Sequence, residues 1–384
     1  MLPRDQEPFD PLTSGSIPQN DLKPYGNPVI KVIGVGGGGS NAVSRMFKEK
    51  IPGVEYYAVN TDAQHLARSE VSNRLTIGQS LTRGLGAGGN PDIGRQAAEE
   101  SIEQIEQMVG GADMVFLAAG MGGGTGTGAI PIIAQTAKDA GALTVAVVSK
   151  PFSFEVATRR KNTEEGLSRI IDHVDTLITI PNDRLLQLEH AQEHSKSWDD
   201  ALRLADSVLH QGIQAVAEVV TVPGEINVDF ADVKAIMHNA GPAWLAIGKG
   251  KGENRAIDAA KMATRSPLLD ISVDGAKRIL FVMTGGPSLS LVELQQASEV
   301  MHELADPDAN LIFGTVKDPK MDDEVKVTLI AASFPLAQEN LIQRQDELRR
   351  LLRDTVSHTD NGDELDVPSF LRKEALSRTG GYFG

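Results

Sequence analysis

The chain has 384 residues, 41% of them hydrophobic and 23% charged, which predicts two domains with tails and excludes a largely disordered protein. Its formal net charge of −15 argues against a general surface for nucleic acid or anionic membranes, because both require clustered Lys and Arg. The sequence has no Cys, which excludes disulfides, thiolate metal sites and Cys nucleophiles.

The N-terminal segment 1–27 contains five prolines and little periodicity, so we predict a mobile arm. It has neither the basic start nor the apolar run of a signal peptide, and no stretch of about 18 apolar residues occurs in the chain. These features predict a cytoplasmic protein without direct membrane insertion.

Residues 28–205 alternate between strand and helix patterns and predict an α/β domain. A β-branched run begins it at Val29–Ile33, and helical stretches such as Gln96–Met108 and Ile130–Asp139 separate the later strands. The alternation indicates a Rossmann-like parallel sheet covered on both faces, whose ligands bind at the carboxyl ends of the strands. The later segments typical of strands are Tyr56–Asn60, Met114–Ala118, Leu143–Ser149 and Thr176–Ile180.

The second half of the chain predicts a long central helix followed by a smaller α/β domain. A helical pattern runs from Trp198 to Val220, and we place the central helix at 206–226 and the smaller domain at 227–334. Residues 335–362 form a charged, Gln-rich linker, which is either an amphipathic helix or a partly helical connector. In the tail 363–384, the apolar and basic peptide Asp366–Arg372 predicts a partner-binding site. The segments expected to be regular in the smaller domain are strands at Ile279–Thr284, Asn310–Val316 and Glu324–Ala332, with two intervening helices that include Leu291–Leu304.

The first glycine run, Gly34–Gly39, follows a strand, precedes a helix and satisfies the G-x-G-x-x-G pattern of dinucleotide-binding folds. Glycine lets the backbone approach a phosphate, and the helix N-terminus then presents free N–H groups. Asp62 stands where a dehydrogenase needs an acid for the ribose. This loop therefore fits either a nicotinamide dinucleotide or a nucleoside triphosphate.

A second glycine run, Gly120–Gly128, follows a predicted strand and precedes a helix that we expect to begin near Ala129. Two such loops at neighbouring strand ends favour a triphosphate held by backbone amides, with Thr125 and Thr127 adding hydroxyl donors or a metal contact. A third loop, Gly84–Asp92, has the flexibility to respond to a terminal phosphate. The chain has no G-x-x-x-x-G-K-[ST] motif, so we expect amides and Mg²⁺ to replace the P-loop lysine.

The run Gly122–Gly128 resembles the signature loop of the tubulin/FtsZ family. Together with Gly36–Gly39, Asn60–Ala63 and Asn227–Asp232, it makes the chain similar to the bacterial FtsZ cell division proteins over roughly residues 29–334. The resemblance implies the tubulin/FtsZ fold and a GTPase that uses GTP, GDP and Mg²⁺ and polymerises head-to-tail into filaments at the division site. It also implies recruitment of membrane-anchor and regulatory division proteins through Asp366–Arg372.

The same resemblance implies the nucleotide contacts. Glu155 binds the ribose with Arg159 as its basic companion, and Asp206 recognises the base. Leu202 replaces a Phe that stacks on the guanine, which lowers affinity by ~1 kcal/mol, and Val156 replaces the Gly that usually follows the Glu. The full set of implied nucleotide-binding residues is Gly37, Gly38, Gly39, Ser40, Asn41, Asn60, Gly124, Thr125, Gly126, Glu155, Arg159 and Asp206.

The resemblance also implies that Asn227, Asp229 and Asp232 enter the nucleotide pocket of the next subunit, where the two carboxylates orient the attacking water. A simpler reading of the two acids is a helix N-cap followed by an acid in the first turn. No protein ligand is assigned to Mg²⁺, which we expect the phosphates and water to hold. Two alternatives stay open: an NAD-dependent oxidoreductase that uses the first glycine loop, and a filament-forming protein that hydrolyses GTP slowly.

Overall fold

The computed structural model describes residues 28–185, 187, 198–222, 226, 228–268, 276–303, 305–306 and 308–333. The predicted N-terminal arm, the linker and the peptide Asp366–Arg372 lie outside the described residues, as does Asn227. The described residues up to Ala332 belong to one unit. Among the described helices, none is long and apolar enough to cross a membrane.

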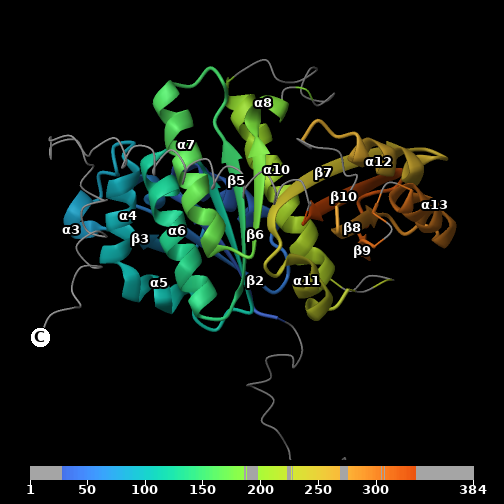
Figure 1. Ribbon diagram of the computed structural model, residues 1–384, viewed down its shortest axis with the longest axis horizontal. Coiled ribbons are helices and arrows are strands. Elements are labelled where there is room, and N and C mark those ends of the chain that lie inside the picture. Colours follow the sequence, from blue (N-terminus) through green and yellow to red (C-terminus); the bar gives the residue numbers. More distant parts are fainter. Residues whose placement is uncertain are drawn as a thin grey trace, which may run out of the picture. The chain divides into compact units, whose positions relative to one another are not determined.

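The N-terminal half is a parallel sheet with helices on both faces, as the sequence predicts (Figure 1). Its strand order is β3-β2-β1-β4-β5-β6, and every neighbouring pair is parallel. The parallel order directs the carboxyl ends of all six strands to one edge of the sheet. The strands are β1 (Ile30–Val35), β2 (Val54–Asn60), β3 (Asn73–Thr76), β4 (Met114–Gly120), β5 (Leu143–Lys150) and β6 (Thr176–Pro181).

Two helix predictions for this half need correction. The helix expected to begin near Ala129 begins at Gly124, so part of the second glycine run is helical. The helix expected over Gln96–Met108 is two helices separated at Ser101, whose Oγ accepts a hydrogen bond from the Gly78 N–H (3.0 Å). The helices are α1 (Gly36–Met46), α2 (Ala63–Ala67), α3 (Gln79–Thr82), α4 (Pro91–Glu100), α5 (Ile102–Val109), α6 (Gly124–Asp139), α7 (Ala157–Ile170) and α8 (Asn182–Leu185), with short 3₁₀ turns at Phe47–Glu49 and Ile171–His173.

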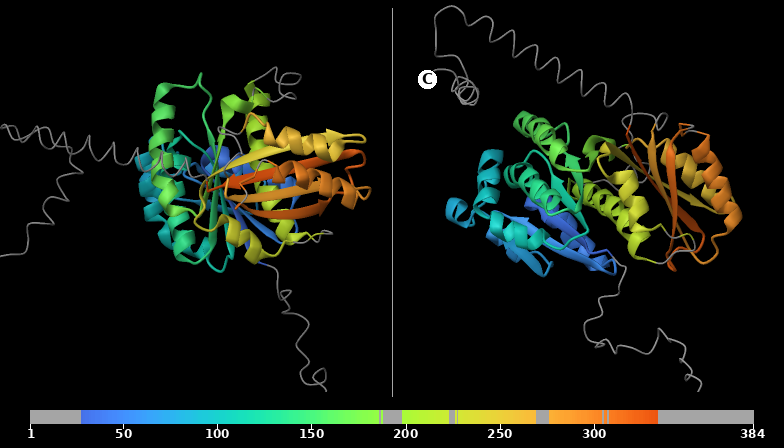
Figure 2. Two further views of the ribbon diagram at one scale, coloured as in Figure 1. Left: turned by 45° about the vertical axis from the view of Figure 1, so that its right-hand side comes forward. Right: turned by 60° about the horizontal axis from the view of Figure 1, so that its bottom comes forward.

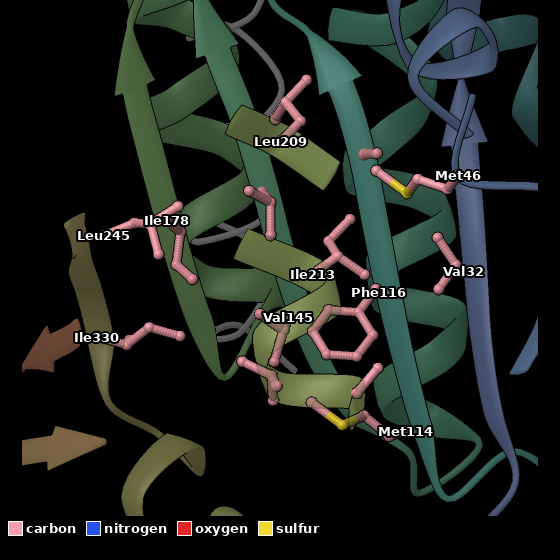
Figure 3. Close-up of a cluster of buried hydrophobic side chains, with 14 of the residues drawn as sticks. Val32, Met46, Met114, Phe116, Val145, Ile178, Leu209, Ile213, Leu245 and Ile330 are labelled. Atoms are coloured by element: carbon pink, nitrogen blue, oxygen red, sulfur yellow. The ribbon is translucent and has the colours of Figure 1, made fainter. Parts of the chain in front are cut away.

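The strands divide their side chains between two hydrophobic clusters, one on each face of the sheet. Phe116 and Val145 pack on one face with residues of α1 and of the central helix α10 (Trp198–Thr221), as Figure 3 shows. Leu117 and Val148 point to the other face, which α5 and α6 cover. Because successive side chains of a strand point to opposite faces, near-continuous apolar strands are required to fill both clusters.

Helix α10 lies between the two halves of the molecule. In the right-hand view of Figure 2 it lies between the blue-to-green N-terminal part and the orange C-terminal strands. Its residues Leu209 and Ile213 share a cluster with N-terminal Phe116 and with C-terminal Leu245 and Ile330 (Figure 3). The helix begins at Trp198, as the helical pattern predicts, and therefore extends across the proposed domain boundary at 206. Its first turns reach the edge of the sheet where the strands end.

The C-terminal half continues the same sheet in the order β7-β10-β8-β9, with β10 antiparallel to both of its neighbours and β8 parallel to β9. The sequence predicted a smaller α/β domain joined by the helix, but β6 and β7 also pair over three residue pairs, from Thr176–Gly241 to Ile178–Ala243. The elements are α11 (Phe230–Met237), β7 (Gly241–Lys251), α12 (Arg255–Thr264), β8 (Arg278–Gly285), α13 (Leu291–His302), β9 (Asn310–Lys317) and β10 (Glu324–Ala332).

Strand β7 was missed in the sequence because glycines interrupt its pattern. A Cβ at Gly248 would lie 2.0 Å from the Ala259 carbonyl oxygen, and one at Gly250 would lie 1.9 Å from that of Arg255. These glycines therefore allow α12 to pack directly on the strand.

Candidate functional site

A pocket of about 270 Å³ lies at the carboxyl ends of β4, β5 and β6 and the start of α1. The place agrees with the general rule for ligands of open parallel sheets. Two sets of predicted residues meet in it: glycines of both glycine runs, and the charged residues assigned to ribose and base. The lining residues are Gly37, Gly38, Gly120, Met121, Gly123, Gly124, Thr125, Gly126, Ser149, Pro151, Glu155, Arg159, Asn182, Leu202, Ala205 and Asp206.

The N-termini of α1 and α6 both point into this pocket. The first N–H groups of a helix have no partner within the helix, and the helix dipole adds partial positive charge there. Neither N-cap, Val35 or Gly123, makes a side-chain capping hydrogen bond, and neither first turn contains an acidic residue. In a chain with a net charge of −15, two uncapped helix ends form a site suited to an anion such as a phosphate group.

The glycines divide into those that allow packing and those that face open space. A Cβ at Gly39 would lie 2.1 Å from the Ala118 carbonyl oxygen, and one at Gly128 would lie 1.9 Å from that of Pro91. Gly36 adopts a φ of +72°, and a Cβ there would lie 2.6 Å from the Gly126 nitrogen, so it lets the two helix ends approach each other. The sequence interpretation, which assigned the whole second run to a ligand, is thus too simple.

Gly37 and Gly123 both line the pocket and both have free space beyond their Cα atoms. A Cβ at Gly123 would meet nothing within 4 Å, and one at Gly37 would meet only the end of the His65 ring at 3.7 Å. Their missing side chains leave room for a ligand to approach the backbone.

The hydroxyl groups near the two glycine runs have different roles. Thr125 lines the pocket, and its Oγ1 lies 2.6 Å from the Thr61 Oγ1. Thr127 is buried, and its Oγ1 accepts a hydrogen bond from the Gly122 N–H (2.8 Å), so it stabilises the loop and does not face the pocket. The Oγ of Ser40 is buried without a hydrogen-bond partner among the described residues.

Four of the residues implied by the resemblance, Gly39, Ser40, Asn41 and Asn60, do not line the pocket. Gly39 packs against β4. Asn60 is buried at the end of β2, where its Oδ1 accepts a hydrogen bond from the Thr61 N–H (2.9 Å). Asn41 lines a second, adjacent hollow. The Asn60 amide oxygen holds the backbone that leads to Thr61, and the assignment of Asn60 to base and ribose stays a prediction.

Glu155 and Arg159 form the wall of the pocket at the N-terminus of α7 and are joined by an ion pair. The other carboxylate oxygen of Glu155, Oε1, accepts a hydrogen bond from the Phe152 N–H (2.9 Å). The Glu155 side chain therefore anchors the loop after β5 and also orients the Arg159 guanidinium group at the pocket.

Asp206 and Leu202 reach the pocket from the first turns of α10. Burial raises the pKa of Asp206 to about 6, and the opposite charge of Arg45, 3.4 Å away, partly counters that rise. Leu202 is 37% exposed, so it offers an apolar surface at the same end.

Asn182, at the start of α8, also lines the pocket and was missed in the sequence. Its buried Oδ1 has no partner among the described residues. Its position directly after β6 is the signal that would have identified it.

The third loop lies against the start of α6. A Cβ at Gly124 would lie 2.9 Å from both the Ala87 Cβ and the Asn90 nitrogen. The Asn162 Nδ2, on α7, donates hydrogen bonds to the carbonyl oxygens of Gly89 (3.3 Å) and Gly122 (3.4 Å). Asn162 therefore connects the third loop to the loop that precedes α6, a link that no motif indicates.

Asp229 and Asp232 do not join this pocket. Asp229 caps α11, with its Oδ1 accepting a hydrogen bond from the Asp232 N–H (2.8 Å), and both residues are exposed. From Asp206 to Thr221 helix α10 rises about 22 Å, and α11 lies at the end of the molecule opposite to α8 (Figure 1). The simple N-cap reading thus describes the local structure, and the two carboxylates are outside the pocket of their own chain.

Two family models match the chain. The GTPase domain of the Tubulin/FtsZ family matches residues 29–190, and the C-terminal domain of the FtsZ family matches residues 241–335. The first match contains both glycine runs and Glu155, and the second contains β7 to β10.

Solved structures agree with the family models. An empty FtsZ dimer from M. jannaschii is 43% identical, with a TM-score of 0.77 over 80% of this chain and 88% of that chain. A GTPγS-bound protofilament of CetZ2 from Haloferax volcanii is 19% identical, with a TM-score of 0.67 over 84% and 99% of the two chains. A GDP-bound monomer of CetZ1 from the same organism is 20% identical, with a TM-score of 0.68 over 79% and 93%. The two CetZ structures support the fold alone. Because archaeal proteins are among the matches, the resemblance to the bacterial FtsZ proteins in particular is not confirmed.

Proposed function

This chain belongs to the Tubulin/FtsZ family of GTPases, and from that premise we propose that it binds GTP, hydrolyses it to GDP and phosphate, and polymerises head-to-tail into filaments. The observation that carries the proposal is the convergence of two uncapped, acid-free helix N-termini on one pocket whose other end holds Asp206. This arrangement suits a ligand with a polyphosphate at one end and hydrogen-bond donors at the other.

In the proposed orientation the phosphates lie against the backbone N–H groups of Gly37, Gly38 and Gly124–Gly126. The ribose lies beside Glu155 and Arg159. The base lies between Leu202 and Asp206, and the unpaired oxygen of Asn182 supplies a further acceptor on the same wall.

Mg²⁺, bound with the nucleotide, supplies neutralisation of the charge that develops on the phosphates. The described residues contain no group of three or more His, Asp or Glu side chains arranged for a metal ion. We therefore propose that phosphate oxygens and water hold the ion, while the helix N-termini contribute the remaining positive potential.

Hydrolysis in this proposal requires a second copy of the chain. The described lining of the pocket holds a charged wall and amide donors, and none of its carboxylates is placed to orient water at the phosphate end. Asp229 and Asp232 are exposed at the end of the chain opposite to its own pocket. In a head-to-tail filament this end faces the pocket of the next subunit, and Asn227 is proposed to act there with the two acids. Such a contact is heterologous and does not close, so it generates filaments.

The oxidoreductase alternative fits less well. A dinucleotide fold uses one glycine-rich helix end for its pyrophosphate, whereas here the helix ends of both glycine runs line the same pocket. The family comparisons also give it no support. Tight NADH binding without any response to GTP would restore it.

The assembly-dependent activity is testable with the purified full chain. GTP turnover per subunit is measured against protein concentration, and sedimentation is compared in GTP with Mg²⁺ and in GDP with Mg²⁺. We expect the protein to sediment in GTP with Mg²⁺ but not in GDP with Mg²⁺. We also expect turnover per subunit to rise steeply above a threshold protein concentration. Turnover per subunit that is independent of concentration would contradict catalysis by a neighbouring subunit.

A mixing experiment tests the division of the active site between subunits. Asp232→Asn removes the proposed catalytic charge and leaves the Asp229 cap in place, while Asp206→Ala damages the pocket and leaves the acids intact. Each variant alone should hydrolyse GTP slowly, and the mixture should recover turnover that neither has. If Asp232→Asn retains the turnover of the wild type, Asp232 takes no part in catalysis. That result would favour the alternative of a filament-forming protein that hydrolyses GTP slowly, in which the two acids only stabilise the start of α11.

The remaining parts of the proposal concern the cell. We propose that the chain is cytoplasmic, concentrates at the division site, and binds membrane-anchor and regulatory division proteins through Asp366–Arg372, which lies outside the described residues. Deleting residues 363–384 should leave GTP turnover unchanged and abolish the localisation of a fluorescent fusion.

A further inference from the structure

Arg45 lies between the nucleotide pocket and a second hollow. Its Nη1 is 3.4 Å from the Oδ2 of Asp206, which lines the pocket. Arg45 itself lines the second hollow, of about 390 Å³, together with Lys48 and Arg68. It therefore reaches the carboxylate of Asp206 from outside the pocket. Its side chain is 39% exposed, whereas that of Asp206 is 13% exposed.

Arg45 is the charged neighbour that acts on Asp206. Burial raises the pKa of this carboxyl, and the charge of Arg45 lowers it. On the opposite wall of the pocket, Glu155 and Arg159 pair with each other. In the second hollow, Lys48 pairs with Glu70 at 2.9 Å. The other charged or titratable groups nearest along α10 itself are Asp200, Arg203 and His210.

A guanine base presents two adjacent donors, the N1–H and the 2-amino group. An ionised carboxylate accepts one hydrogen bond on each oxygen, whereas a protonated carboxyl carries a donor on one of them. Asp206 can therefore match both guanine donors only in its ionised form.

We propose that Arg45 is a positioning residue for guanine recognition: it pairs with Asp206 from behind the pocket and presents that carboxylate, ionised, to the two donors of the base. This inference rests on the proposed function, since it requires that the pocket takes a guanine nucleotide. It adds to that function a residue that does not line the pocket and acts through another side chain.

The test compares GDP with inosine diphosphate, which lacks the 2-amino group. Both have the same diphosphate, so titration of the phosphates cancels in the ratio of their affinities. Calorimetric titrations of the dilute full chain between about pH 5 and about pH 8 give this ratio for the wild type, Arg45→Gln and Arg45→Lys. The diphosphates avoid GTP-driven assembly during the measurement.

For the wild type we expect GDP to bind about 10- to 100-fold more tightly than inosine diphosphate at neutral pH, because one hydrogen bond to a charged group is lost. That preference should decline as the pH falls through about 6, where Asp206 gains a proton. In Arg45→Gln the midpoint of the decline should move upward by about one pH unit, with the preference restored at high pH. Arg45→Lys retains a cation and should keep a midpoint close to that of the wild type.

Arg68→Gln is the matched control, because Arg68 lines the same hollow and does not form an ion pair with Asp206 among the described contacts. It should leave the midpoint unchanged. An unchanged midpoint in Arg45→Gln, an equal loss of preference at every pH, or an equal shift in Arg68→Gln would each overturn the inference. A wild-type chain that binds neither diphosphate would refute the proposed function instead.

Discussion

Replacing Gly123 with Ala separates the two roles of the glycine run, ligand approach and packing. Gly123 lines the pocket and caps α6 with φ −82° and ψ 175°, a backbone conformation that Ala adopts without strain. A Cβ there would meet nothing within 4 Å. Ala restricts the unfolded chain more than Gly, which stabilises the fold by about 0.4–1 kcal/mol, but Ala is a poorer N-cap by a similar amount. The free energy of unfolding should therefore change by less than about 1 kcal/mol.

The same methyl group should weaken nucleotide binding. It occupies space beside the N–H groups at the start of α6, which we propose hold phosphate. A lost hydrogen bond to a charged group costs about 1.5–3 kcal/mol, which corresponds to about a 10- to 100-fold lower affinity for GDP. Calorimetric titration with GDP and urea unfolding measure the two effects on the same preparation.

Gly128→Ala is the matched control at the other end of the run. Its Cβ would lie 1.9 Å from the Pro91 carbonyl oxygen and 2.7 Å from the Arg95 nitrogen, so α4 and α6 would have to separate. We expect the free energy of unfolding to fall by about 1–3 kcal/mol. If Gly123→Ala is as stable as the wild type and still binds GDP with wild-type affinity, the reasoning about the open space at Gly123 is refuted.

Three further predictions concern single residues around the pocket. Burial raises the pKa of Asp206 from 3.8 to about 6, so the stability that its protonated form contributes is full below about pH 4 and is lost as the pH rises through about 6. Asn does not titrate, so the free energy of unfolding of Asp206→Asn, measured in urea, should rise relative to that of the wild type by up to about 3 kcal/mol between these limits. Leu202→Phe should tighten GDP binding by about 1 kcal/mol in calorimetry, because it offers an aromatic face to the base. Asn162→Ala removes the hydrogen bonds to Gly89 and Gly122; it should speed deuterium exchange in residues 84–92 and lower kcat for GTP severalfold, on the scale of about 1 kcal/mol per hydrogen bond.

Each of these predictions has a contradicting result. An Asp206→Asn gain that is the same at every pH would show that the effect is not titration of this carboxyl. An unchanged GDP affinity in Leu202→Phe would place the base away from residue 202. Unaltered exchange in residues 84–92 of Asn162→Ala would show that the two hydrogen bonds do not restrain the loop.

Several parts of the structure could be predicted from local sequence because they depend on periodicity. The apolar runs now seen as β1, β4 and β5 fill clusters on both faces of the sheet, and such strands occur in parallel sheets with helices on each side. The two glycine runs indicated phosphate-binding helix ends, because glycine before a helix leaves N–H groups accessible. Glu155 and Asp206, which the family resemblance assigns to ribose and base, do line the pocket.

Other features depend on contacts between residues far apart in the chain. Gly128 is a glycine because α4 crosses α6 there, and Gly248 is one because α12 packs on β7. No local pattern indicates either of these close contacts between elements. The glycine run that contains Gly128 was therefore assigned to a ligand, and β7, which contains Gly248, was not predicted as a strand. The pairing of β6 with β7 likewise joins residues more than 60 positions apart and makes one sheet of two predicted domains.

Residue type and short-range spacing were enough to predict the family, the parallel sheet and the two glycine loops that meet at the pocket. The electrostatic setting of Asp206 and the location of Asp229 and Asp232 became clear only from the folded chain. Burial and the nearby Arg45 together set the protonation of Asp206. The length of α10 keeps the other two away from their own pocket. Both are properties of distance through space, which residue spacing along the chain does not contain.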